Sequence, residues 1–150
     1  GGDRRGSGTL GGGGALRGLC SSGKSRRVVR VKLLVGGVAL TVLVADEPAE
    51  RERGLMGNTT LGVDEGMVFV YPEARPRYFW MKDTPLPLSI AFVGADGRIV
   101  SIADMTPLST ALTPSGAPAM YAIEVHQGWF AAHGIAVGAT VTGLMPASRE

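Results

Sequence analysis

Short apolar segments separated by turn residues are the feature that most limits the folds open to this chain. The segments are Met67–Tyr71, Arg77–Met81, Leu88–Val93, Ile99–Ile102, Met120–Val125 and Val141–Leu144. Asp96-Gly97 lies between two of them, and this dipeptide is a strong β-hairpin signal. Many short strands with turns between them are typical of β-sandwiches and barrels. We therefore expect a mostly β fold, either a small antiparallel sandwich or a partly closed barrel.

The segment VVRVKLLVGGVALTVLVAD at positions 28–46 has two interpretations. In the first it is a β-hairpin, because two β-branched runs flank Gly36-Gly37, a pair that tolerates positive φ. In the second it is a secretory signal, with a charged region at Arg26–Lys32 and an apolar region at Leu33–Ala45. Polar residues interrupt the apolar run, which favours the hairpin. The run is also too short to span a membrane, which takes about 20 apolar residues.

Two short helices are expected beside the strands. Pro48–Arg53 (PAERER) predicts one helical turn, with Asp46 as its N-cap and Gly54 ending it. Trp129–His133 lies between two glycines and predicts a brief second helix.

The 150 residues provide one domain. Residues 1–27 are rich in Gly, Arg and Ser and are expected to be a disordered tail, because glycine loses much entropy on ordering. We assign residues 28–145 to a single all-β domain and residues 146–150 to a C-terminal tail. The N-terminal segment is compatible with organellar or exported targeting, or with a linker or a misannotated start, so the compartment stays open.

Charge is spread unevenly along the chain. Residues 1–32 hold eight basic residues against one acidic residue, a net charge of +7. The rest holds seven basic and twelve acidic residues, a net charge of −5. Because phosphate contacts dominate nucleic-acid binding, an acidic domain without a basic stripe is not expected to bind nucleic acid.

Two phosphate-binding patterns occur in the first 27 residues. Residues 18–25 read GLCSSGKS, a literal P-loop match, and residues 6–11 fit the dinucleotide-binding glycine pattern. Either pattern requires a strand before it and a helix after it, so that helix-terminal N–H groups meet the phosphates. Neither context is present, so no nucleotide or other cofactor is expected.

Catalytic and metal-binding sets are not assembled by spacing. His126 and His133 are the only histidines, and Glu124 shares a strand face with His126. No further ligand is placed near them, so no metal is expected. No nucleophile–base arrangement is indicated either, and we assign no catalytic residue.

Residues 53–93 carry an uncommon combination of motifs. These are RGLMG at 53–57, GMVFV at 66–70 and FWMKDT at 79–84, followed by an apolar strand. The combination resembles the family catalogued as domain of unknown function 192 (also UPF0127), and the resemblance covers Val28 to Leu144. It implies a small all-β domain with one or two short helical turns, and the family name carries no reaction. The family pattern usually has Asn at the position of Asp83 and Asp at the position of Ser89.

The FWMKDT segment is the candidate functional site. On a strand, Phe79 and Met81 face one way while Trp80 and Lys82 face the other. Glu124 lies in an apolar run that matches the family's apolar-Glu-apolar motif, and a buried carboxylate requires a partner. Lys82 is the candidate partner, on an adjacent strand within salt-bridge range. The pair has two interpretations: a structural ion pair that links two strands, or part of a functional site. We favour the structural ion pair.

Two functions remain open. The first is a non-catalytic binding or accessory module, whose groove near Trp80 and Lys82, with the Thr106–Pro118 loop, holds a small anionic ligand or a peptide. The second is an enzyme of unknown reaction that uses Lys82, Asp83 and Glu124. The sequence favours the first, and it does not indicate the ligand or the oligomeric state. The expected ligand-binding residues are Trp80, Lys82, Asp83, Thr84 and Glu124.

Overall fold

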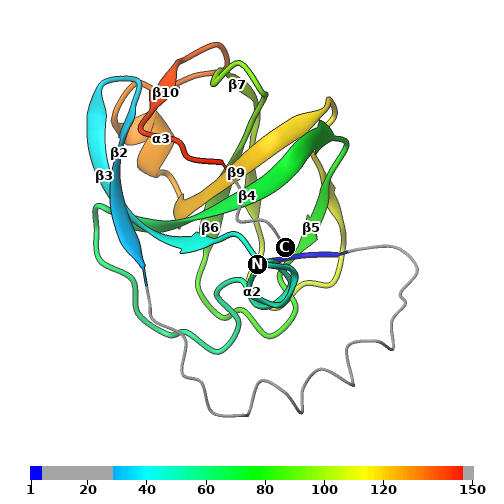
Figure 1. Ribbon diagram of the computed structural model, residues 1–150. Helices are drawn as coiled ribbons and strands as arrows, with labels where there is room; N and C mark the ends of the chain where they lie inside the picture. The colour runs from blue at the N-terminus through cyan, green and yellow to red at the C-terminus, as the bar shows by residue number, and fades with distance from the viewer. Residues whose placement is uncertain (5–28, 147–150) are drawn as a thin grey trace.

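A computed structural model describes residues 1–4 and 29–146 of the chain (Figure 1). Strands dominate, and the mostly β prediction is confirmed. The strands are β1 (Gly2–Asp3), β2 (Arg30–Val35), β3 (Val38–Ala45), β4 (Glu65–Arg75), β5 (Tyr78–Trp80), β6 (Leu88–Val93), β7 (Ile99–Met105), β8 (Thr113–Pro114), β9 (Ala119–His126) and β10 (Val141–Thr142). The helices are α2 (Pro48–Arg53) and α3 (Trp129–Ala132).

The strands form two sheets. The larger has seven strands in the order β10-β2-β3-β4-β9-β6-β7 and curls into a half-barrel (Figure 1). A bridge between Arg98 and Thr140 draws its two ends together. The smaller sheet has the order β1-β5-β8. Every pair is antiparallel except β3 and β4, which are parallel because the chain passes through α2 before it returns.

The two predicted hairpins are present. Val35 pairs with Val38 across the turn formed by Gly36 and Gly37. Their φ angles of 56° and 86° are both positive, as a type I′ turn requires. The second hairpin joins β6 to β7, and Gly97 in its turn has a φ of 83°.

Side-chain alternation divides the interior into two cores, one on each face of the large sheet. On β9, Tyr121, Ile123 and Val125 face the core inside the half-barrel, which α3 fills with Trp129 and Phe130. The opposite face of the sheet packs against β5. There, the rings of Phe69, Phe79 and Phe92 meet edge to face, with centroids 4.8 and 5.6 Å apart.

Both short helices are confirmed, with one change at the start of α2. The N-cap is Glu47 rather than Asp46. Glu50 explains the difference, because its Oε1 accepts hydrogen bonds from the backbone N–H groups of both Glu47 and Asp46, at 3.2 and 3.1 Å. Gly54 ends the helix with a φ of 53°, as expected.

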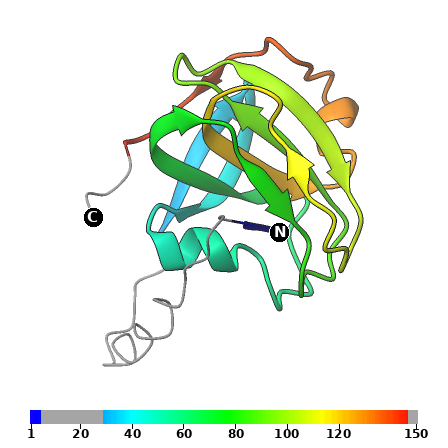
Figure 2. The same cartoon turned by 90° about the vertical axis from the view of Figure 1, so that its right-hand side faces the viewer.

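The predicted N-terminal tail is described only at its first four residues. There the structure differs from the prediction, since Gly2–Asp3 form strand β1 beside β5 and α2 (Figure 2). Residues 5–28, including both phosphate-binding patterns, and residues 147–150 lie outside the described part of the chain. Neither helix in the described part has the length and apolar character needed to cross a membrane.

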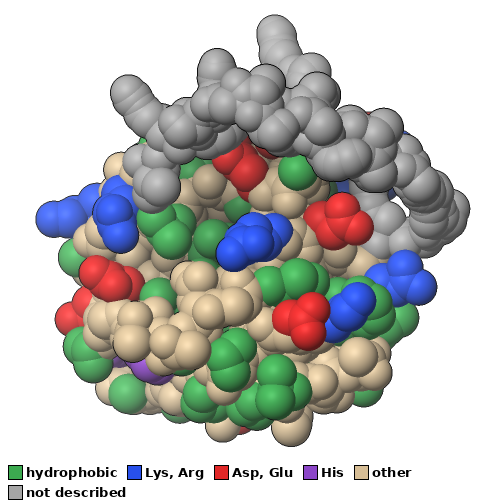
Figure 3. Space-filling model, turned by 90° about the horizontal axis from the view of Figure 1, so that it is seen from below, with side chains coloured by type: hydrophobic (Ala, Val, Ile, Leu, Met, Phe, Trp, Pro, Cys, Tyr) green, Lys and Arg blue, Asp and Glu red, His purple; other side chains and the backbone are tan. Residues whose placement is uncertain are grey.

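The described surface seen from below carries charges of both signs. Lys and Arg side chains are interspersed there with Asp and Glu, and apolar and neutral groups separate them (Figure 3). No large patch of a single sign forms on the described part of that face.

Candidate functional site

The first residues of the chain lie in a slot between β5 and the end of α2. Gly2 pairs with Trp80 and Asp3 with Phe79, and the Arg4 N–H donates to the Tyr78 carbonyl at 2.9 Å. We call the space that holds residues 1–3 the terminal slot. Its walls are Tyr78–Met81 and Glu52–Gly54, and Glu124 lies at its inner end.

The inner end of the slot has room for backbone atoms but not for a side chain. A Cβ on Gly1 would overlap the Trp80 carbonyl oxygen, and one on Gly2 would overlap the Glu52 carbonyl oxygen. A Cβ on Gly54 would in turn overlap the Gly1 carbonyl oxygen. These neighbours are backbone atoms and cannot rotate away, so the close approach requires glycine at all three positions.

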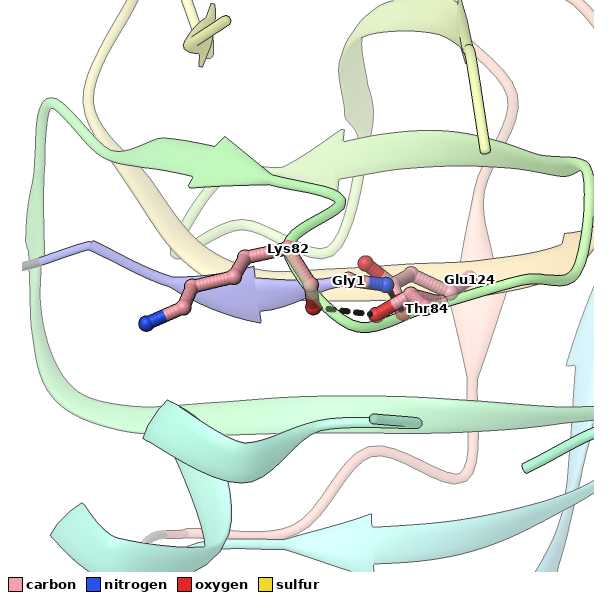
Figure 4. Close-up of polar contacts among 4 residues, drawn as sticks. All are labelled: Gly1, Lys82, Thr84 and Glu124. Atoms are coloured by element: carbon pink, nitrogen blue, oxygen red, sulfur yellow. Dashed lines mark hydrogen bonds and ion pairs between the residues drawn. The ribbon is translucent and has the colours of Figure 1, made fainter. Parts of the chain in front are cut away.

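Glu124 ends the slot with a fully buried carboxylate. The residue is 0% exposed on the central strand β9, opposite Met67 and Ile90. Its Oε1 accepts a hydrogen bond from the Gly1 amino group at 2.8 Å, and the two groups form an ion pair (Figure 4). Its Oε2 has no hydrogen-bond partner among the described residues. The carboxylate therefore has one cationic partner and one oxygen still able to accept.

Burial dominates the electrostatics of this pair. It raises the pKa of Glu124, and the adjacent Gly1 amino group opposes the rise. Burial also lowers the pKa of the Gly1 amino group, and Glu124 opposes that change. Each charge is costly alone in this apolar setting, and each makes the other less so.

The prediction of an ion pair between Lys82 and Glu124 is wrong. Lys82 is exposed, and its side chain extends away from Glu124 (Figure 4). No ion pair between the two is found in the described part of the chain. The reason is topological: β9 pairs with β4 and β6, whereas β5, which precedes Lys82, belongs to the other sheet.

The alternation predicted for the FWMKDT segment is confirmed. Phe79 and Met81 are buried, Trp80 is half-buried and Lys82 is exposed. The Lys82 Nζ lies 5.5 Å from the centre of the Trp80 ring, and the Arg4 guanidinium lies 5.0 Å from the same ring. Trp80 thus forms a wall that attracts cations.

Asp83 and Thr84 hold a turn that shapes the slot. Asp83 has a φ of 55°, a left-handed conformation that Asn and Asp tolerate better than most residues. Its carbonyl accepts from the Gly57 N–H at 2.8 Å, which joins the RGLMG and FWMKDT segments. Thr84 is buried, and its hydroxyl donates to the Lys82 carbonyl at 3.0 Å. The change from the family's usual Asn to Asp83 therefore preserves a backbone role.

A second polar cluster, which the sequence analysis missed, surrounds Asp3. The ring of Tyr71 lies under the guanidinium groups of Arg51 and Arg77, at 4.8 and 3.6 Å from its centre. Burial raises the pKa of Tyr71 well above its usual value, and the adjacent Asp3 raises it further. A tyrosine at the end of an apolar run and two arginines near Pro48 and Pro76 gave no sequence signal of this grouping.

The two histidines serve different contacts. The His126 Nε2 contacts the Leu61 carbonyl, whereas the His133 Nδ1 lies 2.9 Å from the Trp129 carbonyl. Within residues 1–4 and 29–146, no three His, Cys, Asp or Glu side chains are grouped to hold a metal ion.

Ser89, at the second position that departs from the family pattern, joins three elements. Its hydroxyl donates to the Asp104 Oδ1 at 2.7 Å and accepts from the Gly128 N–H at 3.0 Å. It is 2% exposed on β6, and these bonds connect it to β7 and to the start of α3. Ser89 therefore acts as a structural link rather than as part of the slot.

Replacing Ser89 with alanine is expected to lower the free energy of unfolding by about 1–2 kcal/mol, since two part-buried hydrogen bonds are lost. Urea unfolding followed by circular dichroism measures this loss. Thr110→Ala, at an exposed loop position, should change stability by less than about 0.5 kcal/mol. Equal stability of the two variants would contradict the linking role.

Together these features define a small, curled β domain with a fully buried carboxylate at the inner end of the terminal slot. The sequence matches the family of domain of unknown function 192, described as an uncharacterized ACR, over residues 31–143. The chain belongs to this family, which confirms the resemblance predicted from its motifs.

Two solved structures are similar to this chain. One is a protein from Sinorhizobium meliloti described as a candidate transcription regulator, with a TM-score of 0.74 and 32% identity, covering 79% of this chain and 96% of its own. The other is a protein of unknown function from Novosphingobium aromaticivorans, with a TM-score of 0.69 and 32% identity, covering 79% and 92%. A search of curated proteins found no match.

Proposed function

We propose that the protein is a non-catalytic binding module that holds an extended peptide in the terminal slot, with a cationic group of the peptide on Glu124. The observation that carries this proposal is the fully buried carboxylate of Glu124, whose Oε2 has no hydrogen-bond partner among the described residues. A carboxylate buried among apolar side chains is costly without a cation. Glu124 therefore favours an amine over the small anion that the sequence left open.

Strand addition supplies the second part of the binding. β1 lies along one edge of β5, while β8 occupies the other edge. A peptide that adds a strand to a sheet edge gains affinity from main-chain hydrogen bonds, independent of its side chains. Residues 2–4, which pair with Tyr78–Trp80 on β5, mark the backbone path that such a peptide would follow.

The expected site residues take distinct parts in this proposal. Glu124 binds the cationic group, Trp80 lines the slot, and Asp83 with Thr84 holds the turn beside it. Lys82 lies at the rim, over the Trp80 ring. The alternative function, an enzyme that uses these three charged side chains, is less well supported, because Lys82 points away from Glu124 and Asp83 is exposed.

The test uses the chain carrying Gly2→Val, so that its own residues 1–4 no longer fit the slot. The probe is the hexapeptide Gly-Gly-Asp-Arg-Arg-Gly with a C-terminal fluorescein, and polarisation measures its binding. We expect Gly2→Val to bind the probe at least about tenfold more tightly than the unchanged chain, where the tethered end competes at an effective concentration of about millimolar.

Matched variants separate slot binding from general effects. Gly12→Val makes the same substitution elsewhere in the glycine-rich segment and should bind as the unchanged chain does. Adding Glu124→Gln to Gly2→Val should weaken binding at least about tenfold, because the amine loses its counter-charge, whereas adding the exposed Glu73→Gln should not. If the Gly2→Val chain is folded but does not bind the probe, the proposed function is refuted.

A further inference from the structure

We propose that Arg51, Tyr71 and Arg77 form a binding site for an oxyanion, which is a carboxylate or phosphate group of a ligand. We call these three residues the Tyr71 cluster. They come from α2, from β4 and from the position before β5, so the site belongs to the β domain and does not depend on the first residues of the chain. The site is separate from the proposed function, because it uses neither Glu124 nor the backbone edge of β5.

Two positive charges converge on one aromatic ring. The Arg51 guanidinium lies 4.8 Å from the centre of the Tyr71 ring, and the Arg77 guanidinium lies 3.6 Å from it. Burial lowers the pKa of Arg77, and the positive charge of Arg51 lowers it further, so the two cations are close enough to repel each other. An anion bound beside both of them replaces this repulsion with attraction.

Backbone carbonyls fix the orientation of both guanidinium groups. Nη1 of Arg51 donates to the carbonyls of Asp46 and Val70, at 2.8 and 3.0 Å. Nε of Arg77 donates to the Ala119 carbonyl at 3.1 Å. A neutral carbonyl orients a guanidinium without cancelling its charge. Groups held in this way lose little entropy when they bind the oxygens of a carboxylate or a phosphate, whose geometry they match.

The Tyr71 hydroxyl adds a hydrogen-bond donor to the two charges. Tyr71 is 2% exposed, and its hydroxyl has no hydrogen-bond partner among the described residues. Burial raises the pKa of Tyr71 well above its usual value, so the hydroxyl keeps its proton. A buried hydroxyl without a partner is costly. A bound oxyanion relieves this cost by accepting the hydrogen bond.

The three groups together define the ligand class. Each is a hydrogen-bond donor at neutral pH, and two of them carry a positive charge. The group that they bind must therefore accept hydrogen bonds and be negatively charged. Carboxylates and phosphates satisfy both conditions, whereas a neutral amide lacks the charge.

Asp3 lies beside the Tyr71 cluster in this structure. It is 7% exposed, and its charge adds to the effect of burial in raising the pKa of Tyr71. A ligand must therefore displace this carboxylate. Asp3→Ala removes the competing charge and leaves space for a carboxylate from solution, so it is the form of the chain in which the site is measured.

The test measures the binding of inorganic phosphate and of succinate to the full-length chain carrying Asp3→Ala, by isothermal titration calorimetry near neutral pH. We expect at least one of the two anions to bind with a dissociation constant on the order of 1 mM, as suits a ligand of few atoms. The unchanged chain, where Asp3 competes, should bind at least about fivefold more weakly. Succinamide, the neutral analogue of succinate, should not bind. Binding of succinate alone assigns a carboxylate ligand, and binding of phosphate alone assigns a phosphate group.

Variants of the Asp3→Ala chain separate the Tyr71 cluster from general charge effects. Arg77→Gln should weaken anion binding at least about tenfold, and Arg77→Lys, which keeps the charge but not the planar fork, should weaken it less. Tyr71→Phe should weaken binding about three- to fivefold without lowering the midpoint of urea unfolding, because the hydroxyl has no partner to lose. Arg75→Gln, at an exposed arginine paired with Glu73, should change binding less than about twofold.

Two results would overturn the site. If neither anion binds folded Asp3→Ala in a saturable way, the Tyr71 cluster is not an oxyanion site. If Arg75→Gln weakens binding as much as Arg77→Gln does and Tyr71→Phe has no effect, the anions respond only to the general charge of the surface. These measurements use no peptide and leave Glu124 unchanged. Their failure therefore leaves the proposed function standing, and failure of the peptide test leaves this site standing.

Discussion

Replacing Phe79 with alanine is expected to lower the free energy of unfolding by about 3–5 kcal/mol. Phe79 is 0% exposed, and its ring packs edge to face between those of Phe69 and Phe92. These rings pack β5 against the large sheet, so the loss of the Phe79 ring opens a cavity between the sheets. Because small domains are stable by only about 5–15 kcal/mol, this single change removes a large share.

Urea unfolding of Phe79→Ala and of Tyr78→Ala provides the comparison. Tyr78 is the preceding residue of the same strand but is 45% exposed, so its replacement should cost less than about 1 kcal/mol. Phe79→Leu fills most of the cavity and should recover more than half of the loss. Similar losses at Phe79 and Tyr78 would show that β5 does not anchor the small sheet.

The strands and their faces were largely predictable from sequence because they depend on local periodicity. In the FWMKDT segment, alternation alone placed Phe79 and Met81 inward and Trp80 outward, as observed. Gly36-Gly37 defined a hairpin because few other pairs accept two positive φ angles. Glu124 was likewise recognised as a buried charge from its apolar neighbours alone.

The partner of Glu124 was not predictable in the same way. The sequence favoured Lys82, since both residues were expected on neighbouring strands, but strand order within sheets depends on the whole topology. The partner in the structure lies 123 positions away, in a segment that composition predicted to be disordered. Composition predicts the entropy cost of ordering the glycines, but it does not predict the contacts that one amino group and one aspartate make in the fold.

The two family motifs also take on a physical meaning only in three dimensions. Gly54 allows the Gly1 carbonyl to approach, and Gly57 donates to the carbonyl of Asp83. The RGLMG and FWMKDT segments, distant in sequence, thus build opposite sides of one slot. The missed cluster of Arg51, Tyr71 and Arg77 extends the same slot outward.

The stability of the protein is expected to depend on pH through Glu124, in the direction opposite to that of an ordinary ion-paired carboxylate. Burial raises its pKa in the folded state above the value of about 4.5 that applies to the unfolded chain. Between those two pKa values, the folded state holds one more proton than the unfolded state. The contribution of Glu124 to stability is therefore greatest below this window and falls as pH rises through it, by up to about 1.4 kcal/mol per pH unit.

Glu124→Gln removes this titration while keeping the size of the side chain. Urea unfolding from about pH 4 to about pH 8 measures the free energy of unfolding of this variant and of the unchanged protein. The variant's value minus that of the unchanged protein should rise as pH rises through the window and stay constant above it. Glu73→Gln, at an exposed carboxylate on β4, should follow the unchanged protein throughout. If Glu124→Gln also followed it, Glu124 would keep the same proton affinity folded and unfolded. The rise in the pKa of Glu124 on folding, and the pH dependence that follows from it, would then be wrong.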